Sequence, residues 1–181
     1  MDAIELLKHD HRMVEQLFRD YHAAANETQR RAVVELTIRE LSKHAALEEM
    51  MFYPMARKVL PDGGRRIDEH LVEHMAVKKL LHALDKLPSG DTREADLMDQ
   101  LRREVEEHVR EEEGELMPEV RDHAPQEHLE RLGRLLKQAK QGAPTRPHPH
   151  APDRPPGLTV LGPVAAAYDR VRDRLQGRPS T

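Results

Sequence analysis

The chain has 181 residues, enough for one domain with a hydrophobic core, and its charged residues (34%) nearly equal its hydrophobic residues (38%). Its 29 basic and 33 acidic residues are interspersed, which excludes a basic face for nucleic acid, and the absence of cysteine excludes disulfides, iron–sulfur clusters and thiolate metal sites. Any metal must therefore bind through nitrogen and oxygen.

Apolar residues recur at intervals of three and four along most of the chain, which predicts an all-α protein. The expected helices cover residues 3–25, 28–58, 65–87, 92–120 and 126–141. Turn clusters at residues 61–64 and 88–91 separate them, and such short links favour antiparallel neighbours. We expect an antiparallel, up-down-up-down four-helix bundle with a short fifth helix.

A proline-rich segment follows this bundle, which should occupy residues 1–141. Residues 142–157 contain six of the thirteen prolines, so we expect an extended, polyproline-like or disordered linker. Residues 158–181 form a C-terminal tail with one short predicted helix. The apolar stripe of that helix consists of Val164, Tyr168, Val171 and Leu175.

The chain contains an internal repeat. The pattern HxxxEExxxxP occurs twice, 64 residues apart, and the helix before each copy also repeats, at an offset of 63. The second match aligns His11 with His74 but places Leu7 opposite His70. The bundle is therefore interpreted as a duplicated helical hairpin with a pseudo-twofold axis.

Histidines and glutamates interrupt the apolar faces of the bundle helices. At 100° per residue, seven of them point toward the predicted core. They are His11, His44, Glu48, His70, His74, His108 and Glu112. A single inward histidine is more often a core or rim residue, but an inward carboxylate costs several kcal/mol unless it is paired or bound to metal. Three helices carry two of the seven one turn apart, so each pair can reach a common centre.

The ligand set also indicates the metal. Seven nitrogen and oxygen ligands exceed the four that a structural zinc needs, and they suit two ions of five or six coordination. The Glu-x-x-His pairs of a ferritin-type centre do not occur in the sequence. Five neutral imidazoles suit iron that cycles between oxidation states, so we expect two iron ions.

The second glutamate of each HxxxEE motif has a different orientation. The helical angle turns Glu49 and Glu113 away from the predicted core, so they are either solvated or support a ligand from outside. The stripe formed by Met51, Phe52 and Met55 is interpreted as core packing and pocket wall.

Over about residues 2–141 the sequence resembles the hemerythrin family, in its bacterial hemerythrin-like or HHE cation-binding branch. The motifs that carry the resemblance are Asp10-His11, HxxxEE from His44, HxxxH at His70 and His74, and HxxxEE from His108. The resemblance implies one iron ligated by three of these histidines, namely His70, His74 and His108, and a second iron ligated by His11 and His44. It also implies that Glu48, Glu112 and an oxo or hydroxo group bridge the two ions.

The chain departs from the oxygen-carrying members, which place an Asp five residues after the fourth helix's histidine. Here Glu112 follows His108 by four, which weighs against reversible oxygen carriage. Because Leu7 stands where the other half has a histidine, one iron lacks a ligand. We expect O2, peroxide or NO to bind there, on the side of His11 and His44.

These observations predict a non-heme di-iron protein that binds or reacts with O2, hydrogen peroxide or NO in protection against oxidative or nitrosative stress. Catalase-like peroxide dismutation needs only the two irons and an open position. The alternative is a non-enzymatic oxygen or iron sensor, or an iron-binding protein. The N-terminus shows no signal-peptide pattern, so a cytoplasmic protein without a membrane or nucleic-acid partner is expected. The oligomeric state and the role of the tail stay open.

Overall fold

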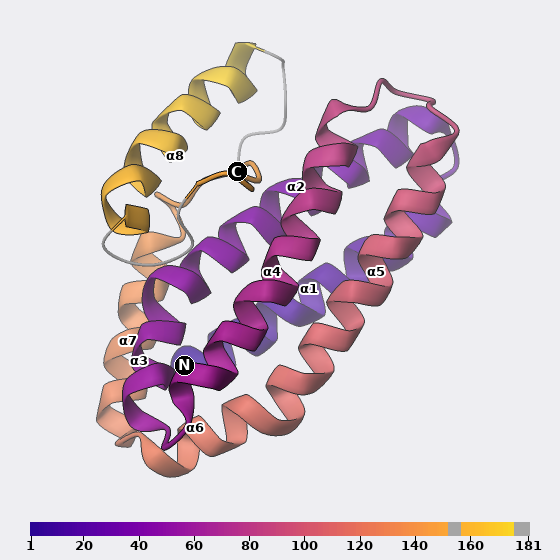
Figure 1. Cartoon of the computed structure of the whole chain (residues 1–181). Helices are drawn as coiled ribbons and strands as arrows, with labels where there is room; N and C mark the ends of the chain where they lie inside the picture. The colour runs from indigo at the N-terminus through magenta and orange to yellow at the C-terminus, as the bar shows by residue number, and fades with distance from the viewer. Residues whose placement is uncertain (152–156, 176–181) are drawn as a thin grey trace.

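The computed structural model describes residues 1–151 and 157–175, and all regular secondary structure within them is helical, which confirms the all-α prediction. Figure 1 shows a bundle of long helical columns with two further helices beside it. The columns are α1 (Ala3–Ala23), α2 with its continuation α3 (Glu27–Leu47, Tyr53–Val59), α4 (Gly63–Lys86) and α5 with its continuation α6 (Arg93–Glu111, Met117–His123). Outside them lie α7 (Gln126–Ala139) and α8 (Gly157–Leu175). Helix α1 packs against α2, and α4 packs against α5.

The helix starts follow from local chemistry. The Asp2 side chain accepts a hydrogen bond from the Glu5 backbone N–H at 3.0 Å, and the Glu5 carboxylate accepts one from the Asp2 N–H at 2.8 Å. This capping box satisfies two backbone donors that the first turn leaves unpaired. The Asn26 side chain caps α2 in the same way by accepting from the Gln29 N–H. Both helices therefore begin within one residue of their predicted starts.

Two predicted helices contain a widened turn that the periodicity does not indicate. Five-residue π-helices, η1 (Glu48–Phe52) and η2 (Glu112–Leu116), connect α2 to α3 and α5 to α6. Each ends just before a proline at the second position of the next helix, Pro54 or Pro118, whose nitrogen cannot donate to the preceding turn. An i→i+5 turn absorbs that mismatch without breaking the helix. The equivalent placement, 64 residues apart, matches the sequence repeat.

The apolar core is divided into two clusters with a polar layer between them. One cluster includes Leu7, Phe52 and Leu116, and the other includes Val14 and Leu101. On each column the predicted ligands fall between residues of the first cluster and residues of the second. The ligands are therefore enclosed from both ends of the bundle.

Helix α7 packs closely against the beginning of α1. A Cβ placed on Gly133 would lie 2.7 Å from the Asp2 carbonyl carbon and 2.9 Å from the Ala3 nitrogen, which are backbone atoms that cannot rotate away. Glycine is therefore required at this crossing, and the fifth predicted helix is part of the bundle's core.

The segment after α7 also contacts the bundle. Residues 142–151 are non-helical, and within them Ala143, Thr145 and Arg146 are buried. The Arg146 guanidinium pairs with Asp85 of α4 and Asp173 of α8. The rest of the predicted linker, 152–156, and the tail end, 176–181, lie outside the described residues.

Two residues of the predicted apolar stripe of helix α8 face solvent. Tyr168 and Val171 are exposed, whereas Ala166 and Asp169 are buried. The Asp169 carboxylate accepts hydrogen bonds from the backbone N–H groups of Thr145 and Arg146. The helix is thus held by polar contacts with the preceding segment. Within residues 1–151 and 157–175, none of the helices combines the length and hydropathy needed to span a bilayer.

We predict that Gly133→Ala lowers the free energy of unfolding by about 1–3 kcal/mol, because the added methyl group forces α7 away from the start of α1. The matched control is Gly114→Ala in η2, where an added Cβ meets nothing within 4 Å. The control should leave stability unchanged or raise it by about 0.5–1 kcal/mol. Urea unfolding of both proteins measures the difference, and equal midpoints would contradict the close packing of α7.

Candidate metal centre

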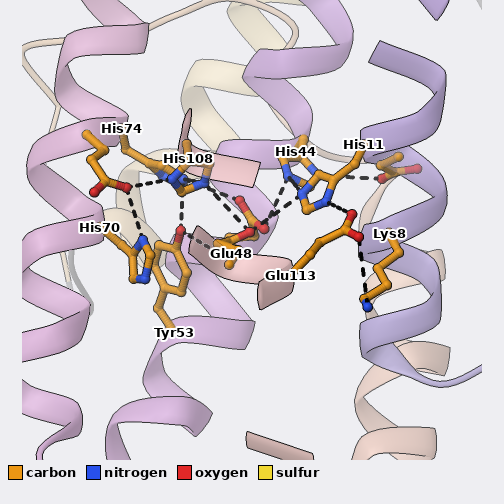
Figure 2. A network of polar contacts seen from close by, with 12 residues as sticks. Lys8, His11, His44, Glu48, Tyr53, His70, His74, His108 and Glu113 are labelled. Atoms are coloured by element: carbon orange, nitrogen blue, oxygen red, sulfur yellow. Dashed lines mark hydrogen bonds and ion pairs between the residues drawn. The ribbon is translucent and has the colours of Figure 1, made fainter. Parts of the chain in front are cut away.

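The seven predicted ligands form one buried layer across the four columns. Figure 2 shows His11 and His44 on one side of Glu48, and His70, His74 and His108 on the other. Their exposed fractions are His11 3%, His44 5%, Glu48 0%, His70 6%, His74 3%, His108 5% and Glu112 0%. Solvent therefore contributes almost nothing to the stabilisation of any charge in this layer.

The first half of the layer contains His11 and His44. Their Nε2 atoms are 3.1 Å apart, and the His44 Nε2 is also 3.1 Å from Glu48 Oε1. The His11 Nε2 lies 3.5 Å from Glu112 Oε2. One ligand atom from each of these four residues lies within 4.8 Å of the other three.

The second half contains His74 and His108, whose Nε2 atoms are 3.2 Å apart. Glu48 Oε2 lies 3.4 Å from the His74 Nε2, and Glu112 Oε2 lies 3.7 Å from the His108 Nε2. Each glutamate therefore contacts one histidine of the first half and one of the second. This arrangement is the one that two carboxylates shared between neighbouring ions would need.

His70 lies at the edge of this second half. Its ring packs edge-on against that of His108, with centroids 5.5 Å apart, and its Nδ1 is 3.0 Å from Glu73. It groups with Glu73 and His108 rather than with Glu48 or Glu112. The structure thus brings six of the predicted ligands into two compact groups and places the seventh beside them.

Four carboxylates surround the layer and face the outer nitrogen of each imidazole. Glu113 Oε1 is 2.8 Å from the His11 Nδ1, and Glu49 Oε1 is 2.9 Å from the His74 Nδ1. An ionised carboxylate can only accept, so these two Nδ1 atoms donate to it, and the Nε2 of each ring, which points toward the centre, is the nitrogen that could bind a metal. Glu49 and Glu113 are therefore groups that support a ligand, the second of the two interpretations offered by the sequence.

The remaining two carboxylates come from the helices that carry His11 and His74, and each directly precedes that histidine. Glu73 contacts the His108 Nδ1 at 2.8 Å, and Asp10 lies 3.8 Å from the His44 Nδ1. Such partners orient metal-binding imidazoles and raise their basicity. All four positions follow the repeat, because Asp10 aligns with Glu73 and Glu49 aligns with Glu113. The repeat itself was the signal that could have identified them.

Tyr53 is a further member of the layer that sequence reasoning missed. Its hydroxyl donates to Glu112 Oε1 at 2.8 Å and lies 2.9 Å from the His74 Nε2. Burial, together with the neighbouring Glu112 and Glu48 carboxylates, raises the pKa of this phenol well above its usual value. The equivalent residue in the other half is Met117, so neither the repeat nor the helical period indicates a functional tyrosine.

The donor set fits a pair of metal cations. Both oxygens of Glu48 and the Oε2 of Glu112 are buried and receive no hydrogen bond of ordinary geometry from any described residue. Pairs of imidazole nitrogens approach to 3.1 and 3.2 Å, which requires a proton or a metal ion between or beside them. Cations in the layer would satisfy both groups of atoms at once.

Without metal, protons on the imidazoles supply the positive charge that the buried carboxylates need. Burial lowers the pKa of His44, but Glu48 and Asp10 outweigh it and raise that pKa to about 10. Burial likewise lowers the pKa of His74, but the neighbouring Glu48 and Glu49 carboxylates outweigh it and raise that pKa to about 9. Burial also favours the protonated form of Glu48, yet His44 and His74 hold its pKa well below the usual range.

Metal loading should therefore release protons. At pH 7 the metal-free protein keeps His44 and His74 protonated, whereas a metal ligand must be a neutral imidazole. We predict release of about two protons per chain on Fe²⁺ binding and an affinity that rises as pH increases from 6 toward 9. Anaerobic calorimetry in buffers of different ionisation enthalpy measures the protons. An affinity that is constant across this pH range would contradict the protonated resting state.

We predict that Glu49→Gln weakens iron binding by about 10–100-fold, because the amide no longer supports the His74 Nδ1–H with a charge. Glu49 is 2% exposed and is held from its other side by Lys78 at 2.6 Å. The control is Glu69→Gln, which removes an exposed carboxylate that pairs with Arg65. Competition with an Fe²⁺ chelator gives both affinities, and circular dichroism checks the fold. Equal affinities of the two variants would show that Glu49 does not support the site.

The sequence matches the family model described as the hemerythrin HHE cation-binding domain over residues 2–120. This span contains the whole layer. An uncharacterized hemerythrin-like protein of Schizosaccharomyces pombe is 31% identical over 143 residues, which cover 77% of this chain and 70% of that protein.

A protein named DNA nickase from a Nostoc species is 26% identical over 140 residues, which cover 77% of this chain but only 39% of that protein. Among solved structures, a hemerythrin HHE cation-binding domain-containing protein of Mycobacterium kansasii superposes with a TM-score of 0.67. The match covers 78% of this chain and 86% of that chain at 24% identity, which shows a shared fold.

Proposed function

Because the chain belongs to the hemerythrin HHE cation-binding family, we propose that its buried layer holds two iron ions and that the protein reacts with a small molecule at them. The observation that carries this proposal is that Glu48 and Glu112 each contact histidines of both halves. Three of the four oxygens of these two carboxylates receive no hydrogen bond from a described residue, and two shared carboxylates of this kind suit two neighbouring cations better than one.

The proposed ligands divide along the two halves. His11 and His44 hold one iron, and His74 and His108 hold the other, with His70 completing the second set. Oxygen and nitrogen donors of this kind suit iron, which supplies one-electron redox chemistry when bound. The first iron has fewer histidines than the second, because the position equivalent to His70 is occupied by Leu7, which is buried and apolar.

The surrounding residues determine which reactions can occur. The two apolar clusters exclude water from both ends of the layer, and the four outer carboxylates keep the imidazoles in one orientation. The Tyr53 hydroxyl can hold a proton at the second half of the layer. These features support the handling of hydrogen peroxide, NO or O2, and peroxide dismutation needs no further cofactor. Protection against oxidative or nitrosative stress is the role that fits best.

We predict two irons per chain in the wild-type protein and loss of both in Glu48→Ala, because the shared carboxylate serves both ions. His11→Ala should release mainly one iron. The control Glu115→Ala, an exposed glutamate of η2, should keep both. Metal analysis with optical spectra before and after peroxide gives the result. Two tightly held irons in Glu48→Ala would contradict the shared role.

A sensor is the second candidate, and one contact favours it. Lys140, at the end of α7, pairs with Asp10 at 2.6 Å, and Asp10 faces His44. The adjacent Gln141 carbonyl accepts a hydrogen bond from Arg170 of α8. Occupancy of the first half could therefore alter how α8 is held. Sustained O2 release from hydrogen peroxide by the iron-loaded protein supports the enzyme, and iron-dependent proteolysis of α8 without turnover supports the sensor.

A further inference from the structure

Glu73 differs from the other three carboxylates around the metal layer in its outer partner. Each of the other three pairs with a lysine or an arginine at 2.6–2.8 Å. Within residues 1–151 and 157–175, the ion pairs of Glu73 go only to His70 and His108. Its side chain is 30% exposed, so this carboxylate can be reached from solvent. The described residues therefore leave it without the fixed cation that the equivalent positions have.

A second carboxylate lies where a basic side chain would balance the first. The Glu111 side chain of α5 contacts the Glu73 carboxylate and is itself partly exposed. Arg110, the next residue before it, pairs with Glu107 instead. Two carboxylates in contact repel each other unless a proton or a cation lies between them. This contact is therefore a place where an added cation is stabilised.

A buried imidazole supplies a third metal-binding group at the same place. The His70 Nδ1 is 3.0 Å from Glu73 Oε2, and ligand atoms of His70, Glu73 and His108 all lie within 4.8 Å of one another. The His108 Nδ1 contacts the same oxygen at 2.8 Å, so the other oxygen of Glu73 can bind a cation while His108 keeps its partner. A neutral His70 with its proton on Nε2 presents the Nδ1 lone pair to that cation.

The donor set matches a divalent transition metal in number and in charge. One imidazole nitrogen, two carboxylates and a water make the four ligands of a zinc site with an open position. Two carboxylates and a neutral imidazole balance a divalent ion, since 2 − 2 = 0. An imidazole among the ligands suits Zn²⁺ or Fe²⁺ better than Mg²⁺ or Ca²⁺, which prefer oxygen alone.

We propose that His70, Glu73 and Glu111 form a third cation site, outside the layer, that takes a divalent transition metal such as Zn²⁺ or Fe²⁺. In the conformation that the structure shows, His70 belongs to this outer ion. The second iron of the proposed function then keeps His74, His108 and the shared carboxylates. The outer site does not depend on that function, because neither Glu73 nor Glu111 is a ligand of the layer.

The first test counts Zn²⁺ bound to the metal-free, full-length protein by equilibrium dialysis and metal analysis. Zn²⁺ is the probe because it has no redox chemistry. The wild-type protein should bind one Zn²⁺ per chain that Glu111→Gln loses or binds about tenfold or more weakly, equivalent to about 1.4 kcal/mol. The matched control is Glu107→Gln, which changes the charge equally one turn earlier but removes a partner of Arg110. It should keep the ion.

The second test separates the outer site from the layer. Glu48→Ala removes a carboxylate that both halves share and leaves His70, Glu73 and Glu111 in place. It should still bind one Zn²⁺, and adding Glu111→Gln should remove that ion. Circular dichroism checks the fold of each variant. Anomalous diffraction from zinc-saturated wild-type crystals, which needs no variant, should place an ion against Glu73 and Glu111.

Two results would overturn the inference. One is a Zn²⁺ stoichiometry and affinity that Glu111→Gln leaves equal to those of the wild-type protein. The other is the absence of an anomalous peak at Glu73 and Glu111 after zinc saturation. Failure of the proposed function gives a different pattern, in which the layer holds no metal while one Zn²⁺ sensitive to Glu111→Gln still binds. That pattern supports the outer site.

Discussion

The structure depends on the burial of two carboxylates at the centre of a helical bundle. Glu48 and Glu112 are fully buried, and an ionised carboxylate in such a place is strongly destabilising without positive charge beside it. Four imidazoles converge on these two groups, and they can supply that charge either as protonated rings or as ligands of metal cations. The two apolar clusters belong to the same arrangement. They keep water away from the two carboxylates, so imidazoles or cations have to stabilise the charge in its place.

Charge alternates outward from this centre. Each imidazole of the two compact groups faces a carboxylate on its outer nitrogen, and three of those carboxylates are held in turn by a cation nearer the surface. Lys78 holds Glu49, Lys140 holds Asp10, and Arg12 holds Glu113. Buried ion pairs are expensive in isolation, but solvent stabilises the last member of the two chains that end on Arg12 and Lys140, whose side chains are 54% and 27% exposed. The metal layer is therefore supported by side chains from every column and from α7.

The duplication makes the two halves alike in backbone and different in chemistry. In both halves a π-helix begins at the first glutamate of the HxxxEE motif. That glutamate points inward, and the second glutamate points toward the outer nitrogen of an imidazole. The differences are single residues. In the repeat, Tyr53 aligns with Met117, and His70 aligns with Leu7. The half with His74 and His108 therefore has a phenol and a further imidazole, whereas the equivalent positions of the other half are apolar.

The sequence by itself determined the helical class, the positions of the long helices and the set of inward histidines and glutamates. These features depend on periodicity and on neighbours one turn apart, which are local properties of a helix. Only the tertiary structure decided that Glu49 and Glu113 support histidines of other helices, because a contact between columns depends on their packing and not on the period of either. Packing also decided that Tyr53 enters the layer, that His70 lies at its edge and that α8 turns Tyr168 to solvent. The π-turns before Pro54 and Pro118 depend on hydrogen bonds that leave no trace in hydrophobic spacing, yet each of them begins at one of the two central glutamates.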